Sequence, residues 1–361
     1  MLTQKHVDDR DKSGHDDRGI AGNGQSPALL RKTPHEQRTN DTGAMTSHIL
    51  RRLVESAIVI AVMSFVIYGL IGLMPGDPID LMLGSDPHLT SADVARLKAL
   101  MGIDQPLLKR YAAWAAAALS GDLGYSRLYV RPALAALAAP LGRSALLMGV
   151  SFVLTLALAL PLGIVAALRP RSRLDHTINL ASFVSISLPS FWIGLMLILV
   201  FAASLGWLPA GGIADVGGGG LIDRARHLIL PVATLTIVGF GTFARYMRAG
   251  LLDVLGQDFI RTARAKGASE RRVMLGHALR NAITIVVTVV ALSFGGLFSG
   301  ALVTETLFAY PGMGKLIYDA VLGNDYNLAL AALLLATIMT LLSNLAADIA
   351  YAAIDPRITY R

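Results

Sequence analysis

The sequence predicts an all-α integral membrane protein with six transmembrane helices and with both termini in the cytoplasm. Of its 361 residues, 54% are hydrophobic and only 16% are charged, whereas a soluble domain carries about 25% charged residues. The deficit comes from apolar runs of the length that crosses a bilayer. The net charge of +7 lies largely beside these runs, where it sets topology and contacts anionic lipid. We therefore do not expect nucleic acid as a partner.

The chain begins with a polar stretch and a first transmembrane helix. Residues 1–44 are polar, and the charges of their acidic and basic side chains cancel. Such a segment buries too little apolar surface to fold, so we expect a disordered tail, with Met45 as a plausible start of translation. Residues 45–74 contain the first apolar run, which begins near 53. No A-x-A cleavage signal follows it, so we expect it to remain as an anchor.

Residues 75–142 are expected to form a small extracytoplasmic helical subdomain. The run at 91–101 places apolar residues at helical spacing after Ser91, which is a good N-cap residue. Pro106 suits the first turn of a second helix that reaches about residue 119. This loop is too long for its charges to count in the orientation rule.

The rest of the chain, 143–361, is predicted to form a core of five transmembrane helices. Pro189 and Ser190 lie within the third span of the chain, where a proline marks a kink. They are candidates for a hinge or for a wall of the pathway, although ordinary packing of small residues between helices is the favoured interpretation. The five spans are expected near 144–168, 178–204, 228–248, 283–304 and 327–352.

The most informative charge pattern lies between the fourth and fifth spans. The segment 245–281 holds eight Lys and Arg residues against three acidic residues, whereas the loop 305–326 holds one Lys against three acidic residues. Lys and Arg accumulate in short cytoplasmic loops. We therefore expect the first segment inside the cell and the second outside.

This cytoplasmic loop, about 250–282, is predicted to contain two short helices. The first covers 254–265 and ends before Gly267, at a position that favours a residue with positive φ. Ser269 is a good N-cap for the second helix, and Glu270 suits its N-terminal dipole. An apolar stripe then follows at helical spacing, formed by Val273, Met274, Ala278 and Ala282.

Two short helices of this kind are suited to insert into a groove of a partner and to transmit rigid-body movement to the fourth and fifth spans. The alternative is a basic amphipathic loop that lies on lipid headgroups and only fixes topology. Spacing alone leaves both interpretations open, because basic amphipathic stretches are common at membranes.

The sequence offers no candidate for catalysis, for a cofactor or for a metal. It has no cysteine, which excludes disulfides, zinc ribbons, iron–sulfur clusters and thiol nucleophiles. The run from Gly312 to Lys315 is not a phosphate-binding loop, since Ala309 and Leu316 occupy two of the positions that such a loop specifies. The eight histidines form no metal-ligand pattern. Any hydrolysis of ATP is therefore expected on another chain.

Ordered motifs occur over most of the chain, from about 50 to 361, and the most specific is RTARAKGASERRVMLGHALRNA at 261–282. Together they closely resemble the permease subunits of binding-protein-dependent ABC importers, in particular the dipeptide, oligopeptide and nickel class. The other motifs are PGDP at 75–78, GIDQPLLKRY at 102–111, GDLGYS at 121–126, LPSFW at 188–192, GWLPAGG at 206–212, HLILP at 227–231, ETLFAYPGMGKL at 305–316 and DPR at 355–357.

The resemblance implies a role for the cytoplasmic loop. In that family the loop carries the EAA motif, whose short helix docks on the ATPase subunit. The three letters fall on Arg261, Thr262 and Ala263, so the glutamate is absent, and the family glycine falls on Gly267. The implied ATPase-coupling residues are Asp258, Arg261, Thr262, Ala263, Arg264, Ala265, Lys266, Gly267, Ser269, Glu270, Arg271, Arg272, His277 and Arg280.

The resemblance also implies a bacterial inner-membrane location and several partners besides lipid. These are a second, homologous but different permease subunit, two ATP-binding subunits that hold ATP and magnesium, and an extracytoplasmic solute-binding protein. The chain would form half of a translocation pore and would not itself be an enzyme. Peptides are the first expected solutes, and nickel, glycosides and other small solutes are alternatives.

Two local departures from the family pattern and two other function classes complete the interpretation. Ile283 follows the loop where the family has a proline, so we expect a straighter start of the fifth span, and Asn327 also replaces a proline. A secondary transporter driven by an ion gradient would need ionisable residues at mid-span and an internal repeat. A membrane enzyme would need convergent catalytic groups. Neither pattern is present in the sequence.

Overall fold

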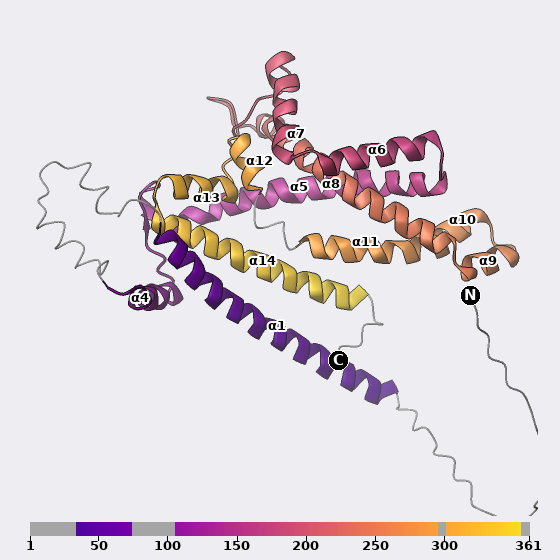
Figure 1. Cartoon of the computed structure of the whole chain (residues 1–361), viewed down its shortest axis with the longest axis horizontal. Helices are drawn as coiled ribbons and strands as arrows, with labels where there is room; N and C mark the ends of the chain where they lie inside the picture. The colour runs from indigo at the N-terminus through magenta and orange to yellow at the C-terminus, as the bar shows by residue number, and fades with distance from the viewer. Residues whose placement is uncertain (1–33, 74–104, 295–300, 355–361) are drawn as a thin grey trace, which may run out of the picture. The chain divides into compact units, whose positions relative to one another are not determined.

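The computed structural model describes residues 34–73, 105–294 and 301–354, and these residues are mainly helical (Figure 1). The chain divides into two compact units, Met1–Ser47 and His48–Arg361. The first unit is described only over 34–47, which form the start of a helix. All the contacts reported below belong to the second unit.

The first helix starts earlier than the sequence predicts. α1 runs from Pro34 to Ile71, so residues 34–44, which the sequence predicts to be disordered, are helical, and residues 1–33 lie outside the described part. Once a helix has nucleated, each further residue adds a hydrogen bond, and Pro34 is compatible with a first helical turn. The part of α1 that is apolar enough to cross a membrane is Leu50–Ile71.

One of the two helices predicted for the outer loop lies within the described residues. α4 (Leu107–Leu119) follows Pro106 as predicted, whereas the helix predicted over 91–101 lies outside the described part. α4 contacts α1 through aromatic rings, and the hydroxyl of Tyr111 lies 2.7 Å from Ser64 Oγ.

A short antiparallel hairpin separates α4 from the next helix. β1 (Tyr125–Ser126) pairs with β2 (Arg131–Pro132), and strands of two residues are too short to produce the alternation that would predict them. α5 (Ala133–Leu168) begins directly after the hairpin, well before the predicted span. Its 36 residues form a helix of about 54 Å, longer than the ~30 Å hydrocarbon core of a bilayer.

α5 packs along α8 (Leu221–Leu255), which contains the predicted fourth span. The two backbones approach closely, because a Cβ atom on Gly163 would lie 2.6 Å from the carbonyl oxygen of Ala244. Small residues at such contacts allow membrane helices to come together. α6 (Arg173–Ser187) also packs on α8, so α5 and α6 share this helix as a neighbour (Figure 1).

The third span is sharply bent rather than continuous. α6 ends at Ser187, and α7 (Ser190–Leu197) continues into a π-helical turn, η1 (Ile198–Ser204). The second arm is bent by 106° from the direction of the first (Figure 1). Pro189 disfavours helical geometry at Leu188, whose backbone is extended with ψ of 133°. The kink that the sequence predicts at Pro189 is therefore present, and the bend is larger than a simple kink in one span at 178–204.

The second half of the chain alternates short and long helices. The fifth candidate span is Glu270–Val290, which starts before the predicted 283–304, and the helix is unbroken at Ile283, where the family proline is absent. Within the described residues, five helices could cross a membrane, or six if the bent pair is one span.

The elements that follow α8 are α9 (Asp258–Ala265), α10 (Glu270–Arg272), η2 (Val273–Ala278), α11 (Leu279–Phe294), α12 (Leu302–Leu307), α13 (Met313–Leu322) and α14 (Tyr326–Ile354).

Candidate functional site

The basic segment from α9 to η2 is attached to the membrane helices by a small apolar core. Ile260 of α9 is fully buried, and so are Val273 and Ala278 of η2 and Ala282 of α11. These residues pack together with Met247, Leu251 and Val254 of α8 and with Ala167 at the end of α5, and Met274 packs against the same cluster. The predicted apolar stripe is therefore confirmed, and it joins α9 to α5, α8 and α11. We call this set of residues the coupling core.

Gly267 turns the chain between α9 and α10. Its φ is +80°, in the left-handed region that residues with a Cβ rarely adopt. Its N–H donates to the carbonyl of Arg264 at 2.9 Å, and the N–H of Ala268 donates to Ala263 at 3.2 Å. A Cβ at this position would meet no described atom within 4 Å. The requirement for glycine therefore comes from the backbone conformation and not from lack of space.

Ser269 and Glu270 begin the second helix, but not in the way that the sequence suggests. Ser269 has the extended backbone of an N-cap, yet its side chain makes no capping hydrogen bond in the described structure. Glu270 instead forms a two-point ion pair with Arg264, at 2.8 Å to Nε and 3.2 Å to Nη2. The ion pair links the end of α9 to the start of α10 across Gly267. Since both side chains are exposed, its contribution is reduced by solvent.

The outer face of the segment is exposed and basic. The residues implied for ATPase coupling are all exposed except Ala263, which is half-buried. The last of them, Arg280, lies at the start of α11. Arg261 pairs with the exposed Asp258, at 3.3 Å. Two large apolar side chains, Phe259 and Leu275, are also exposed, by 40% and 55%. The segment thus has a packed inner face and an outer face that combines positive charge with apolar side chains.

An ion pair that the sequence analysis missed connects α6 to α8 near this segment. Arg248 binds Asp175 through Nε at 2.6 Å and Nη2 at 2.8 Å. Asp175 is almost fully buried and also accepts hydrogen bonds from the N–H of Arg171 and from Asn179 Nδ2. In the sequence, Arg248 is recognisable only as one of the basic residues that set the topology. The one local signal was Ser172, three residues before Asp175, which caps the helix by accepting from its N–H.

Pro189 and Ser190 lie at the bend of the third span and not beside the coupling core. The bend makes a hinge geometrically reasonable, whereas the sequence favoured ordinary packing. A cavity of 410 Å³ opens between α6 and α8, and its lining includes Ile186 of α6 together with Arg245 and Tyr246 of α8. Neither Pro189 nor Ser190 is among its lining residues.

The glycine-rich turn before α13 binds a carboxylate of the chain itself. Glu305 is fully buried and accepts hydrogen bonds from the N–H groups of Gly314 at 2.7 Å and Lys315 at 3.2 Å, and from Ser144 Oγ. A helix N-terminus favours a negative charge. Burial, with Glu305 nearby, raises the pKa of Tyr310, whose hydroxyl donates to the carbonyl of Arg143. The turn therefore holds an internal anion where a nucleotide phosphate would have to bind.

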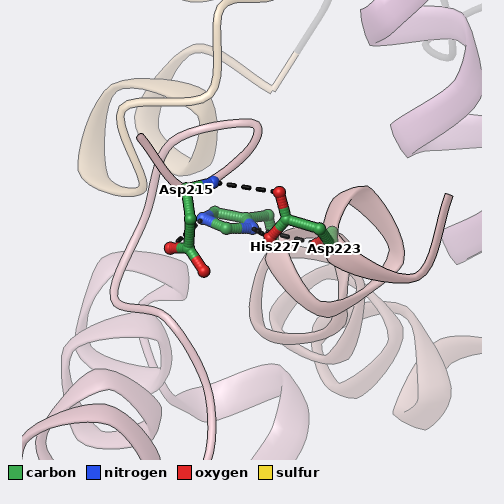
Figure 2. Close-up of side chains that lie close together, drawn as sticks. All are labelled: Asp215, Asp223 and His227. Carbon is green, nitrogen blue, oxygen red and sulfur yellow. Dashed lines mark hydrogen bonds and ion pairs between the residues drawn. The ribbon is translucent and has the colours of Figure 1, made fainter. Parts of the chain in front are cut away.

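Within the described residues, one group of side chains has the composition of a metal site, which the spacing of the histidines in the sequence does not indicate. Asp215 lies in the loop before α8, and Asp223 and His227 lie in its first two turns (Figure 2). One ligand atom from each lies within 4.8 Å of the others. No signal in the sequence indicates this group, because two aspartates four and twelve positions before His227 form no recognisable motif.

Comparison with known proteins places these features in context. The model of the family described as "Binding-protein-dependent transport system inner membrane component" matches residues 159–360, and a model for the N-terminal part of such membrane components matches 45–129. The oligopeptide transport system permease protein AppB of Bacillus subtilis is 38% identical over 88% of this chain and 100% of its own length.

Two further relatives cover the same share of both chains. The di/tripeptide transport system permease protein DppB of Pseudomonas aeruginosa is 35% identical, and the glutathione transport system permease protein GsiC of Escherichia coli is 36% identical. Both comparisons cover 88% of this chain and 100% of the relative. A solved structure of the inward-facing MetNI methionine ABC transporter matches 61% of this chain and 96% of its own, with a TM-score of 0.49 and 18% identity.

Proposed function

This chain belongs to the family of inner membrane components of binding-protein-dependent transport systems and is a permease subunit of an ABC importer, and we propose that it transports small peptides. The proposal is supported by the relatives, which are named for oligopeptides, di- and tripeptides and glutathione. Glutathione is itself a tripeptide, so the three names describe one chemical class. The chain is about equally similar to all three, so we propose short peptides as a class and not one particular sequence.

We further propose that the outer face of α9 to η2 docks on an ATP-hydrolysing subunit. The observation that supports this most is the contrast between its two faces. The inner face is fixed to α5, α8 and α11 by the coupling core, while the outer face leaves Phe259 and Leu275 exposed among basic side chains. A displacement of α9 would therefore move α5, α8 and α11 together, because closely packed interiors transmit displacement.

The proposed assembly contains this permease, a second and homologous permease, two ATPase subunits that bind ATP and magnesium, and a solute-binding protein outside the membrane. Closure of the ATPases would draw the two coupling segments together and change the access of the pore from one side to the other. ATP and solute must bind these two states with different affinities for the cycle to proceed. The bend at Pro189 and Ser190 is the place where we propose that the third span flexes.

The absence of cysteine allows a direct test of the docking proposal. A single cysteine at Arg261, whose side chain is 76% exposed, should cross-link to the ATPase subunit through a short thiol-to-amine reagent. A single cysteine at Val216, an exposed residue in the loop before α8, is the matched control and should not. Equal cross-linking from both positions, or cross-linking from Val216 alone, would contradict the proposed docking face.

A further inference from the structure

The imidazole of His227 is buried between two carboxylates that approach its two nitrogens (Figure 2). Only 3% of the side chain is exposed. Nδ1 lies 3.0 Å from the main-chain oxygen of Asp223 and 3.4 Å from its carboxylate. Nε2 faces the carboxylate of Asp215 at 3.6 Å. Asp215 itself is exposed by 69%, so one side of the group is open to solvent.

These contacts fix where the ring proton must lie. Both atoms near Nδ1 are acceptors, so Nδ1 carries the hydrogen. In a neutral imidazole Nε2 is then an acceptor with a lone pair, and it faces a carboxylate oxygen, which is also an acceptor. Two acceptors at this distance repel each other unless a cation lies between them, which is either a second proton on the ring or a metal ion bound by both atoms. The carboxylate of Asp215 is exposed to solvent, so a metal ion can reach this position.

Asp223 is held in place independently of the ring. Its Oδ2 accepts hydrogen bonds from the N–H groups of Asp215 at 3.0 Å and Gly219 at 2.9 Å. A histidine that binds a metal usually donates its other ring N–H to a carboxylate or a carbonyl, which sets the tautomer and the direction of the lone pair. Asp223 provides both kinds of acceptor to Nδ1, so the ring is already oriented as a ligand.

We propose that His227 Nε2 and the carboxylate of Asp215 bind a divalent transition-metal cation of the zinc class, with Asp223 orienting the ring. One nitrogen and carboxylate oxygens suit zinc and its neighbours, whereas calcium and magnesium prefer sites made only of oxygen. Water would occupy the open side. This proposal does not depend on the solute or on the docking face.

The position of the site suggests what a bound ion would do. Asp215 belongs to the loop that connects the bent third span to α8, and His227 belongs to α8 itself. The same loop is anchored to the residue after α12, because the N–H of Gly212 donates to the carbonyl of Phe308 at 2.8 Å. An ion between Asp215 and His227 would fasten the loop to α8 in addition to the hydrogen bonds that Asp223 already accepts from it. It would therefore stiffen the connection between the bent span and α8.

The test uses the complete transporter, purified without a histidine tag and freed of metal by chelation. Zinc binding is measured by calorimetry, and cobalt binding by its visible absorption, which reports a nitrogen ligand. We expect one ion per permease at this site. Asp215→Ala should weaken binding at least tenfold, and His227→Gln should abolish it together with the cobalt spectrum. Magnesium and calcium should not compete.

Two variants keep the result interpretable. His227 is buried, so its replacement could impair folding, but Asp215 is exposed and its carboxylate makes no hydrogen bond among the described contacts. Asp215→Ala therefore decides the question even if His227→Gln does not assemble. His277→Gln, at an exposed histidine of the basic segment, is the matched control and should leave binding unchanged. Equal affinity in the wild type and Asp215→Ala, loss of binding only in His277→Gln, or no saturable binding would overturn the proposal.

Discussion

Replacing Gly267 by valine should uncouple transport without preventing membrane insertion. The φ of +80° costs a residue with a Cβ about 1–2 kcal/mol, and a β-branched side chain is expected at the upper end. No described atom lies within 4 Å of the added Cβ, so the cost is purely conformational. A change of this size lowers the ratio of this turn to alternative conformations by about 5- to 30-fold. If the turn positions α9 and the alternatives compete with it, transport should fall by up to the same factor.

The assay is peptide uptake into proteoliposomes that contain the whole transporter, with ATP hydrolysis measured in parallel with and without the binding protein. Gly267→Asn should retain most of the activity, because asparagine tolerates the left-handed region. Gly276→Ala is the matched control, since Gly276 also has free space around its Cβ position but lacks a positive φ. Normal uptake and normal stimulation of ATP hydrolysis in Gly267→Val would refute the reasoning, as would an equal loss in Gly276→Ala.

Three further predictions concern stability. Arg248→Ala leaves the buried carboxylate of Asp175 without its ion-pair partner and should destabilise the protein by about 3 kcal/mol, measured by thermal unfolding. Adding Asp175→Asn should recover part of this loss. No recovery would mean that the two residues do not interact. Glu305→Gln replaces the carboxylate that accepts from the N–H groups of Gly314 and Lys315 and should cost about 1–3 kcal/mol, measured by the same assay. An unchanged melting temperature would mean that these hydrogen bonds do not stabilise the turn before α13. Asn327→Pro restores the family residue but removes the donor that binds the carbonyl of Tyr125 at 3.1 Å. It should lower the free energy of unfolding by about 1 kcal/mol. A more stable protein would show that this hydrogen bond contributes nothing.

Patterns with a short period were predictable from the sequence. The apolar runs identified the long helices because a bilayer selects for length and composition. The turn at Gly267 and the buried stripe from Val273 to Ala282 were equally accessible, since each depends on residues within a few turns of helix. The start of α4 after Pro106 was predictable for the same reason.

Features that depend on distant residues were not predictable in this way. Asp175 and Arg248 are 73 positions apart, and no local pattern indicates that two helices bring them together. The sequence indicated a kink at Pro189 but could not give its size, because the angle depends on how both arms pack. Similarly, Glu270 is a reasonable residue at a helix start, and only the fold places Arg264 opposite it.

The bend in the third span has a consequence for the parity of the topology. Each arm has 15 residues, counting η1 with α7, so each is about 22 Å long and too short to traverse the hydrocarbon core alone. With a bend of 106° between the two arms, their far ends lie roughly 27 Å apart, close to the thickness of the hydrocarbon core. Within the described residues, counting the pair as one crossing gives six traverses and counting it as a re-entrant loop gives five, so the path of this one segment sets whether the two ends of the described chain lie on the same side of the membrane.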